Sequence, residues 1–209
     1  DTIGVRTPAI HWELTGLRVN VQERLYGRPA SSLGASSGDP EVAAFAKCYA
    51  NAVLRMIILN GEFHGDPHPG NVFLIGEQDV GFIDFGSVGT LTKTRRDEIV
   101  RLVLAIAGEE TSEVADVLLA WAGAPKVDRD ALAVDLDHLI GEFRGTVLSG
   151  IEFSQIFSRV FDLLRDYQLV LPPDLAILLR TLLTAEGVVR SLAPDYNIAE
   201  DTRPIMTEL

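Results

Sequence analysis

Residues 64–71 read HGDPHPGN, a stretch that holds two histidines, two prolines, two glycines, one carboxylate and one carboxamide. The prolines fix φ and bias the residues before them away from helix, while the glycines allow backbone conformations that other residues resist. The stretch can therefore hardly be helix or strand. We expect a stiff loop that holds the side chains of Asp66 and Asn71 in place before a ligand arrives.

A predicted helix precedes this loop and a predicted hairpin follows it. Apolar residues recur at helical spacing from the sequence DPE at 39–41, a typical helix start, to Asn-Gly at 60–61, a typical helix end. After the loop, two short apolar runs at 72–75 and 80–83 are expected to pair as a small hairpin. The hairpin ends at the sequence DFG, residues 84–86.

A tight hairpin returns the chain close to its start, so Asp84 is expected to approach Asp66 and Asn71. Hard cations such as Mg²⁺ take oxygen ligands and keep waters and substrate phosphates, so one Asp and one Asn can be the protein's share of a site. A second Asp that is free of metal can orient or deprotonate a nucleophile. The order H-x-D, Asn five residues after that Asp and DFG thirteen residues after the Asn is that of the kinase catalytic and metal loops.

The rest of the chain predicts an α+β fold that is mainly α. Residues 9–14 and 17–26 alternate like short strands around a Thr-Gly turn and are expected to form another hairpin. The last helix, rich in leucine, is expected to be a core helix. Arg95, Arg96 and Arg101 are expected on a solvated face. Helices are expected over 93–107, 110–122, 128–144, 152–168 and 173–192.

Composition limits the partners. The chain has 209 residues, 47% of them apolar, and 18 basic against 30 acidic residues give a net charge of −12. This balance argues against nucleic acid as a partner. No stretch approaches the roughly 20 continuous apolar residues of a membrane span, and no signal peptide opens the chain. Cys48, the single cysteine, is expected to be a buried thiol, and a chain without an intrachain disulfide suits a reducing compartment. Because the sequence starts at Asp1 rather than Met, we expect a fragment of a longer protein. We expect it to be soluble and cytoplasmic, with peripheral association at the inner face of a membrane as a further possibility.

Three stretches of the chain resemble the ABC1/ADCK/UbiB family of atypical kinases. The family signature, H-[AG]-D-P-H-P-G-N followed by a strand pair and [LI]-D-F-G, is similar to FHGDPHPGN at 63–71 and VGFIDFGSVGTL at 80–91. The sequence PAIHWELTGLRVNVQERLYG at 8–27 resembles the family's hinge segment. The sequence LPPDLAILLRTLLTAEGVVRSLAPDYNI at 171–198 resembles its closing helix.

The resemblance implies a protein-kinase-like C-lobe that binds ATP and Mg²⁺. By similarity, Asp66 is the catalytic-loop acid, and Asn71 and Asp84 are the Mg²⁺ ligands. His68 occupies the place of the lysine of ordinary protein kinases, where it would either contact phosphate or acceptor or brace the loop. His64 is expected to hydrogen-bond the backbone near the metal loop. The backbone around Gln22, Glu23, Arg24 and Leu25 carries over as the adenine-facing hinge.

The family's upstream features, a K-x-G-Q motif, an Ala-rich nucleotide loop and an ATP-pairing lysine, are absent from this sequence. We therefore expect residues 1–30 to be hinge strands, a remnant of an N-lobe that is otherwise missing, and residues 31–209 to be the helical C-lobe. The implied activity is that of an ATPase or small-molecule kinase that supports isoprenoid-quinone lipid metabolism, with a small-molecule or lipid acceptor.

Two other functions remain open. The first is an aminoglycoside or choline phosphotransferase, because a very similar H-G-D-x-H-x-G-N and I-D-F/W pair occurs there. The second is a catalytically silent nucleotide-binding module that regulates a lipid-enzyme complex. Pro67 and the W-E-L and L-P-P sequences favour the atypical kinases over the phosphotransferases.

Overall fold

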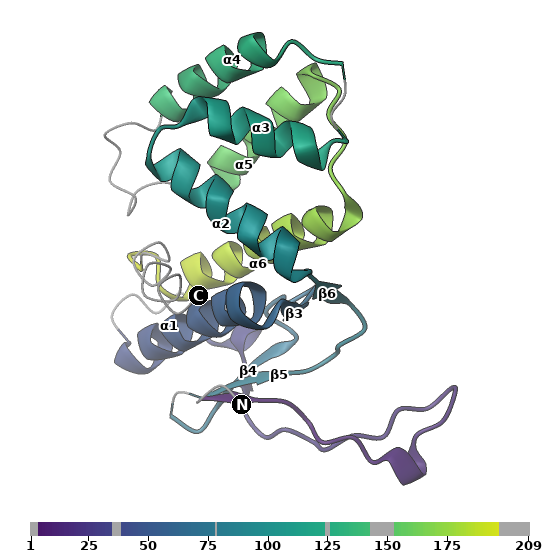
Figure 1. The fold of residues 1–209 in the computed structure, drawn as a ribbon. Coiled ribbons are helices and arrows are strands. Elements are labelled where there is room, and N and C mark those ends of the chain that lie inside the picture. The colour runs from purple at the N-terminus through teal and green to yellow at the C-terminus, as the bar shows by residue number, and fades with distance from the viewer. Residues whose placement is uncertain (1–3, 35–38, 78, 124–125, 143–152, 197–209) are drawn as a thin grey trace.

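A computed structural model describes residues 4–34, 39–77, 79–123, 126–142 and 153–196 (Figure 1). Helices predominate, and the chain also forms a small four-stranded sheet and a separate strand pair. The predicted class, an α+β fold that is mainly α, is confirmed.

The first helix has the ends that its sequence predicted. α1 (Pro40–Arg55) begins after Asp39, whose side chain accepts a hydrogen bond from the N–H of Glu41. It continues into a π-helical turn, η3 (Met56–Asn60), and ends at Gly61 with φ +73°. This left-handed conformation is one that glycine adopts without a Cβ penalty. The helix thus delivers the chain directly to the loop at 64–71.

α1 and η3 together, Pro40–Asn60, are long and apolar enough to cross a membrane by length and composition, although half of the tested window is buried in the fold. The core helix of a soluble protein passes the same test, and Val42, Phe45 and Tyr49 of α1 belong to the main hydrophobic core. The absence of a membrane-spanning segment stays a prediction.

The predicted hairpin after the loop is confirmed, and it forms the centre of a larger sheet. β4 (Val72–Ile75) and β5 (Asp79–Phe82) pair antiparallel, with Val72 opposite Phe82. Two strands that the sequence did not predict flank them, giving the order β1-β5-β4-β2. These are β1 (Val5–Arg6), parallel to β5, and β2 (Arg28–Pro29), antiparallel to β4. η2 (Ala30–Ser32) follows β2.

A second pair of strands joins the two ends of the site. β3 (Glu62–His64) runs into the loop at 64–71, and β6 (Val88–Thr90) follows the DFG sequence. They pair antiparallel, with His64 opposite Val88. Two strand pairs therefore hold the loop at 64–71 and the DFG sequence near each other: β4–β5 lies between them in the sequence, and β3–β6 flanks them.

The predicted hairpin at 9–26 is only partly correct. The chain folds back on itself through isolated bridges, Ile10 with Gln22 and Gly16 with Val19, and η1 (Trp12–Leu14) is a 3₁₀ turn rather than a strand. This ribbon projects from the body of the molecule (Figure 1). Its apolar side chains, such as Trp12 at 75% exposure, have no face of the described fold to bury against. Alternation yields a strand only where one face is covered.

The remaining helices follow the predicted pattern within a few residues. α6 is buried along one side, as expected of a core helix, and contributes Leu175, Leu178 and Val189 to the core that it shares with α1. A second core lies among the preceding helices. The bounds are α2 (Lys93–Ala107), α3 (Thr111–Trp121), α4 (Arg129–Glu142), α5 (Phe153–Asp166) and α6 (Pro173–Leu192).

Two arginines of α2 are not on a solvated face, so that prediction is wrong for them. Arg95 is 20% exposed and donates to Glu98 at 2.7 Å and to Asp174 at 3.0 Å. Arg96 donates to the carbonyl oxygen of Ile58 at 3.1 Å. Both side chains satisfy groups on other elements, η3 and α6, which lie far away in the sequence. Arg101 does lie on the surface, paired with Glu113.

Cys48 is half-buried rather than fully buried, with its Sγ 3.7 Å from the carbonyl oxygen of Gly4. Burial and then the nearby carboxylate of Asp79 raise the pKa of the thiol. Both effects disfavour the thiolate, so Cys48 is not set up as a nucleophile.

Candidate active site at the catalytic loop

His64 joins the loop to the DFG segment. Its side chain is 1% exposed, and Nε2 lies 2.9 Å from the carbonyl oxygen of Ile83. Nδ1 accepts the N–H of Asp66 at 3.1 Å, so the proton belongs on Nε2, which donates to Ile83. The prediction that His64 bonds the backbone near the metal loop is confirmed. The bond between His64 and Ile83 ties the two loops together, because Ile83 directly precedes Asp84 and His64 lies two residues before Asp66.

The loop is held internally as well. The N–H of His68 donates to the carbonyl of Asp66 at 2.9 Å, and the N–H of Asn71 donates to the carbonyl of His68 at 2.8 Å. Tyr49 of α1 donates its hydroxyl to the carbonyl of Pro67 at 2.8 Å. These bonds account for the stiffness expected from the sequence.

His68 braces the loop. Its Nδ1 accepts the N–H of Gly70 at 3.0 Å, and a Cβ at position 70 would come within 2.8 Å of the imidazole ring. The side chain is otherwise exposed. A contact between His68 and phosphate or acceptor stays a prediction.

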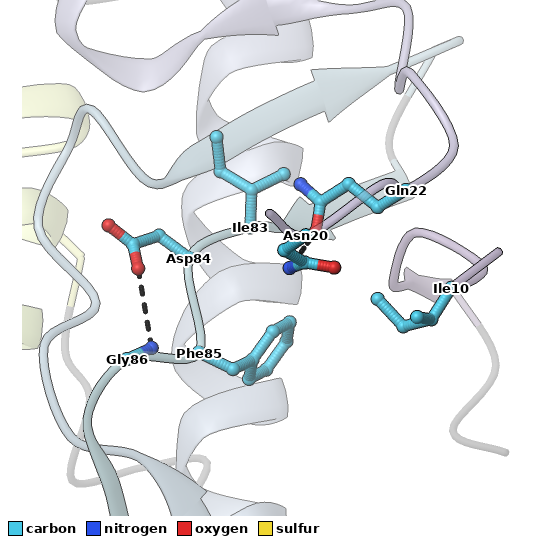
Figure 2. A pocket seen from close by; sticks show the side chains of 7 residues that line it. All are labelled: Ile10, Asn20, Gln22, Ile83, Asp84, Phe85 and Gly86. Atoms are coloured by element: carbon cyan, nitrogen blue, oxygen red, sulfur yellow. Dashed lines mark hydrogen bonds between the residues drawn. The ribbon is translucent and has the colours of Figure 1, made fainter. Parts of the chain in front are cut away.

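Asn71 and Asp84 come to the same end of the β4–β5 hairpin. Asn71 immediately precedes β4, and its carbonyl accepts the N–H of Ile83 at 3.0 Å, which places these two residues opposite each other. Asp84 follows directly, with φ +59°, and its Oδ1 accepts the N–H of Gly86 at 3.3 Å (Figure 2). The side-chain amide of Asn71 donates to the carbonyl of Asp66 at 3.3 Å. These backbone links bring together the three residues that the spacing predicted to meet.

The oxygens of these side chains are uncommitted within the described part of the chain. The Asp66 carboxylate, the Oδ1 of Asn71 and the second carboxylate oxygen of Asp84 accept no hydrogen bond from the described residues. Hard cations take such oxygen donors, so the set fits Mg²⁺. No group of three His, Cys, Asp or Glu side chains suited to a metal occurs in the segments that the structure describes. A cation at this point would therefore need the amide oxygen of Asn71 and phosphate or water oxygens in addition to carboxylate oxygen.

A cavity of about 440 Å³ lies between the DFG segment and the projecting ribbon. Figure 2 shows Phe85 and Ile83 on one side and residues of the ribbon on the other. Two of the lining residues, Asn20 and Gln22, could have been found from the sequence, because residues two apart in an extended chain face the same way. The lining residues are Ile10, Asn20, Gln22, Ile83, Asp84, Phe85 and Gly86.

Of the four predicted hinge residues, only Gln22 lines this cavity. The Glu23 carboxylate accepts the N–H of Ala9 at 3.1 Å. Arg24 stacks over the ring of Tyr26, with the guanidinium carbon 5.3 Å from its centroid. Leu25 lies against the sheet, within 3.2 Å of where a Cβ on Gly81 would be. These three side chains are engaged elsewhere, so any hinge role for them would be through the backbone.

The family follows from the sequence match. A family model described as the ABC1 atypical kinase-like domain matches residues 1–118, more than half of the chain. The chain belongs to this family. A second model, described as the UbiB helical domain, matches residues 136–197, which include α5 and α6. The resemblance inferred from the sequence is therefore confirmed for this ABC1 chain.

Several relatives are similar over nearly the whole chain. The Arabidopsis thaliana protein ACTIVITY OF BC1 COMPLEX KINASE 1, chloroplastic, is 27% identical over 210 residues, which cover 100% of this chain and 31% of that protein. The probable protein kinase UbiB of Cellvibrio japonicus is 27% identical over 205 residues, covering 95% of this chain and 37% of that protein. The chain thus spans about a third of the length of these relatives.

A solved structure shares the fold. It is that of the Rv3197–erythromycin complex from Mycobacterium tuberculosis, with a TM-score of 0.64 and 16% identity, covering 96% of this chain and 52% of that chain. At this identity the likeness concerns the fold alone.

Proposed function

We propose that this ABC1 chain carries the Mg²⁺-binding and catalytic half of an ATP-dependent phosphotransferase or ATPase. The observation that carries the proposal is the meeting of Asp66, Asn71 and Asp84, which are linked by the His64–Ile83, Asn71–Asp66 and Ile83–Asn71 bonds and whose side chains keep free oxygens. Phosphoryl transfer depends mainly on positioning and on electrostatic stabilisation, and a stiff loop supplies the first of these.

The three residues have separate roles in this proposal. Asn71 and Asp84 hold the cation, and Asp66 orients the attacking hydroxyl or water and accepts its proton. When bound, Mg²⁺ supplies charge neutralisation at the phosphate oxygens. His68, exposed beside Asp66, contacts the transferred phosphate or the acceptor. Gln22 and Phe85 line the cavity that would receive the nucleotide base.

The remainder of a longer protein is expected to cover the phosphates. The chain spans about a third of its relatives, and it has no glycine-rich phosphate loop of the G-x-G-x-x-G type. The exposed apolar side chains of the ribbon, among them Trp12 and Leu17, are suited to packing against such a further part of the protein.

The acceptor in this proposal is water or a small or lipidic molecule rather than a protein. The DFG segment runs almost at once into β6 and α2, which leaves no long segment on which a peptide could lie. The resemblance to the ABC1/ADCK/UbiB kinases is the basis for proposing a role in isoprenoid-quinone lipid metabolism, carried out in the cytoplasm and at the inner face of a membrane. Membership of the ABC1 family weighs against an aminoglycoside or choline phosphotransferase. ATP turnover by the full-length protein would exclude a silent regulatory module.

Calorimetric titration of the full-length protein with ADP, with and without Mg²⁺, tests the assignment. Asp84→Asn should lose most of the Mg²⁺-dependent gain in affinity, because of the two aspartates only Asp84 holds the metal directly. Asp66→Asn should keep this gain and lose turnover. Asp97→Asn, a surface carboxylate on α2, is the matched control and should change neither. Equal loss of Mg²⁺-dependent binding in the Asp84 and Asp66 variants would contradict the proposed roles.

A further inference from the structure

Two consecutive side chains of α6 reach the catalytic loop. Arg180 Nη2 donates to the carbonyl oxygen of Gly65 at 2.8 Å and lies 3.0 Å from the hydroxyl of Ser87, to which it also donates. Thr181, which is fully buried, donates its hydroxyl to the carbonyl oxygen of His64 at 3.2 Å. α6 crosses the middle of the molecule next to α1 (Figure 1), so the loop is anchored to the core of the fold.

Arg180 closes a ring between the catalytic loop and the metal loop. The N–H of Gly65 donates to the carbonyl of Ser87 at 2.8 Å, and the guanidinium group spans the Gly65 carbonyl and the Ser87 hydroxyl. A Cβ on residue 65 would come within 2.4 Å of the Ser87 hydroxyl, so glycine permits this close approach. Gly65 immediately precedes Asp66, and Ser87 lies three residues after Asp84. The ring of hydrogen bonds among Gly65, Ser87 and Arg180 therefore fixes Asp66 relative to Asp84.

We propose that Arg180 is a positioning residue for phosphoryl transfer, which sets the placement of Asp66 relative to Asp84; this inference rests on the proposed function above. A misplacement of about 1 Å at such a site can cost roughly a hundredfold in rate. Asp84 also adopts a left-handed conformation, φ +59°, which persists only when its surroundings hold it. Arg180 suits the task because the two N–H bonds of its Nη2 are held in the guanidinium plane and serve both oxygens, whereas the donors of a lysine ammonium rotate freely.

The kinetic test uses full-length Arg180→Gln and Arg180→Lys, with Arg95→Gln as the matched control. Arg95 also donates to α6, at Asp174, but within the described part of the chain its hydrogen bonds go to Asp174 and Glu98 and not to the catalytic or metal loop. Arg180→Gln should lower kcat by about 10- to 100-fold with little change in the KM for nucleotide, because placement and not binding is lost. Arg180→Lys should lose less, and Arg95→Gln should keep the wild-type kcat.

A double-variant cycle tests the route through Ser87. If the bridge carries the effect, Ser87→Ala should lower kcat, and Ser87→Ala combined with Arg180→Gln should lose no more than Arg180→Gln alone. Independent, additive losses would overturn the ring as the means of positioning.

Hydrogen exchange gives a readout that does not depend on activity. Without nucleotide, amides in 62–72 and 84–92 should exchange faster in Arg180→Gln than in the wild type, and at the wild-type rate in Arg95→Gln. Unchanged exchange or an unchanged kcat in Arg180→Gln would overturn the inference, as would equal effects of the Arg180 and Arg95 variants. If the wild-type protein fails to bind Mg²⁺-nucleotide, the proposed function fails, while the exchange data still decide whether Arg180 holds the two loops together.

Discussion

Replacing Asp84 by glycine should stabilise the fold relative to alanine while both changes abolish Mg²⁺-dependent nucleotide binding. Asp84 has φ +59°, a conformation that costs a residue with a Cβ roughly 1–2 kcal/mol. Glycine avoids this cost but loses about 0.5–1 kcal/mol more backbone entropy on folding. The net advantage of Asp84→Gly over Asp84→Ala is therefore about 0.5–1 kcal/mol. Neither variant keeps the side-chain bond to Gly86, so that bond cancels from the comparison.

Chemical denaturation and calorimetry would measure this difference. For a domain of this size, about 0.5–1 kcal/mol corresponds to a rise in Tm of roughly 1–4 °C. Gln168 is the matched control, since it has φ +53° and an exposed side chain in the turn after α5. Gln168→Gly should likewise exceed Gln168→Ala in stability, with no effect on nucleotide binding. If glycine stabilises the fold relative to alanine at position 168 and not at position 84, the left-handed backbone at Asp84 carries no strain, and the prediction is refuted.

Four further predictions concern activity and stability. The 209-residue chain alone should turn over little or no ATP, because it has no glycine-rich loop of the G-x-G-x-x-G type to cover the phosphates; robust hydrolysis abolished by Asp66→Ala would contradict this. The full-length protein should not label a diverse peptide library with radioactive phosphate, and reproducible labelling that disappears in Asp66→Ala would refute the absence of a peptide platform. Gly89→Ala should cost about 1–3 kcal/mol of unfolding free energy, because the new Cβ would lie 2.1 Å from the ring of Phe63, and Phe63→Leu should restore part of the loss in denaturant titrations. A hydrogen bond to Asp135 raises the pKa of Tyr167 from 10.0 to about 12, so this tyrosine contributes stability that is present below pH 10 and is lost as the pH rises towards 12. Tyr167→Phe should show a smaller loss of stability over that range, and an unchanged loss would argue against the pKa shift.

The sequence by itself determined the features that local chemistry controls. Proline and glycine made residues 64–71 a loop, and the cap residues at 39–41 and 60–61 set the ends of α1. The apolar runs and their short connection produced the β4–β5 hairpin, which is enough to bring Asn71 and Asp84 together. Each of these signals acts over a few residues, so it can be recognised without knowledge of the rest of the fold.

Tertiary structure decided what depends on distant partners. The ribbon at 9–26 alternates like a pair of strands but finds no covered face, whereas the two-residue strands β1 and β2 form because β5 and β4 lie beside them. The pattern of α2 could not show that Arg95 would meet Asp174, 79 residues away. Nor could the pattern of α6 show that Arg180 would meet Gly65, 115 residues away. Such pairs become neighbours only when packing of α6 against α1 brings them together, because their contact energies are gained after the chain has paid the entropy of closing the long loops between them.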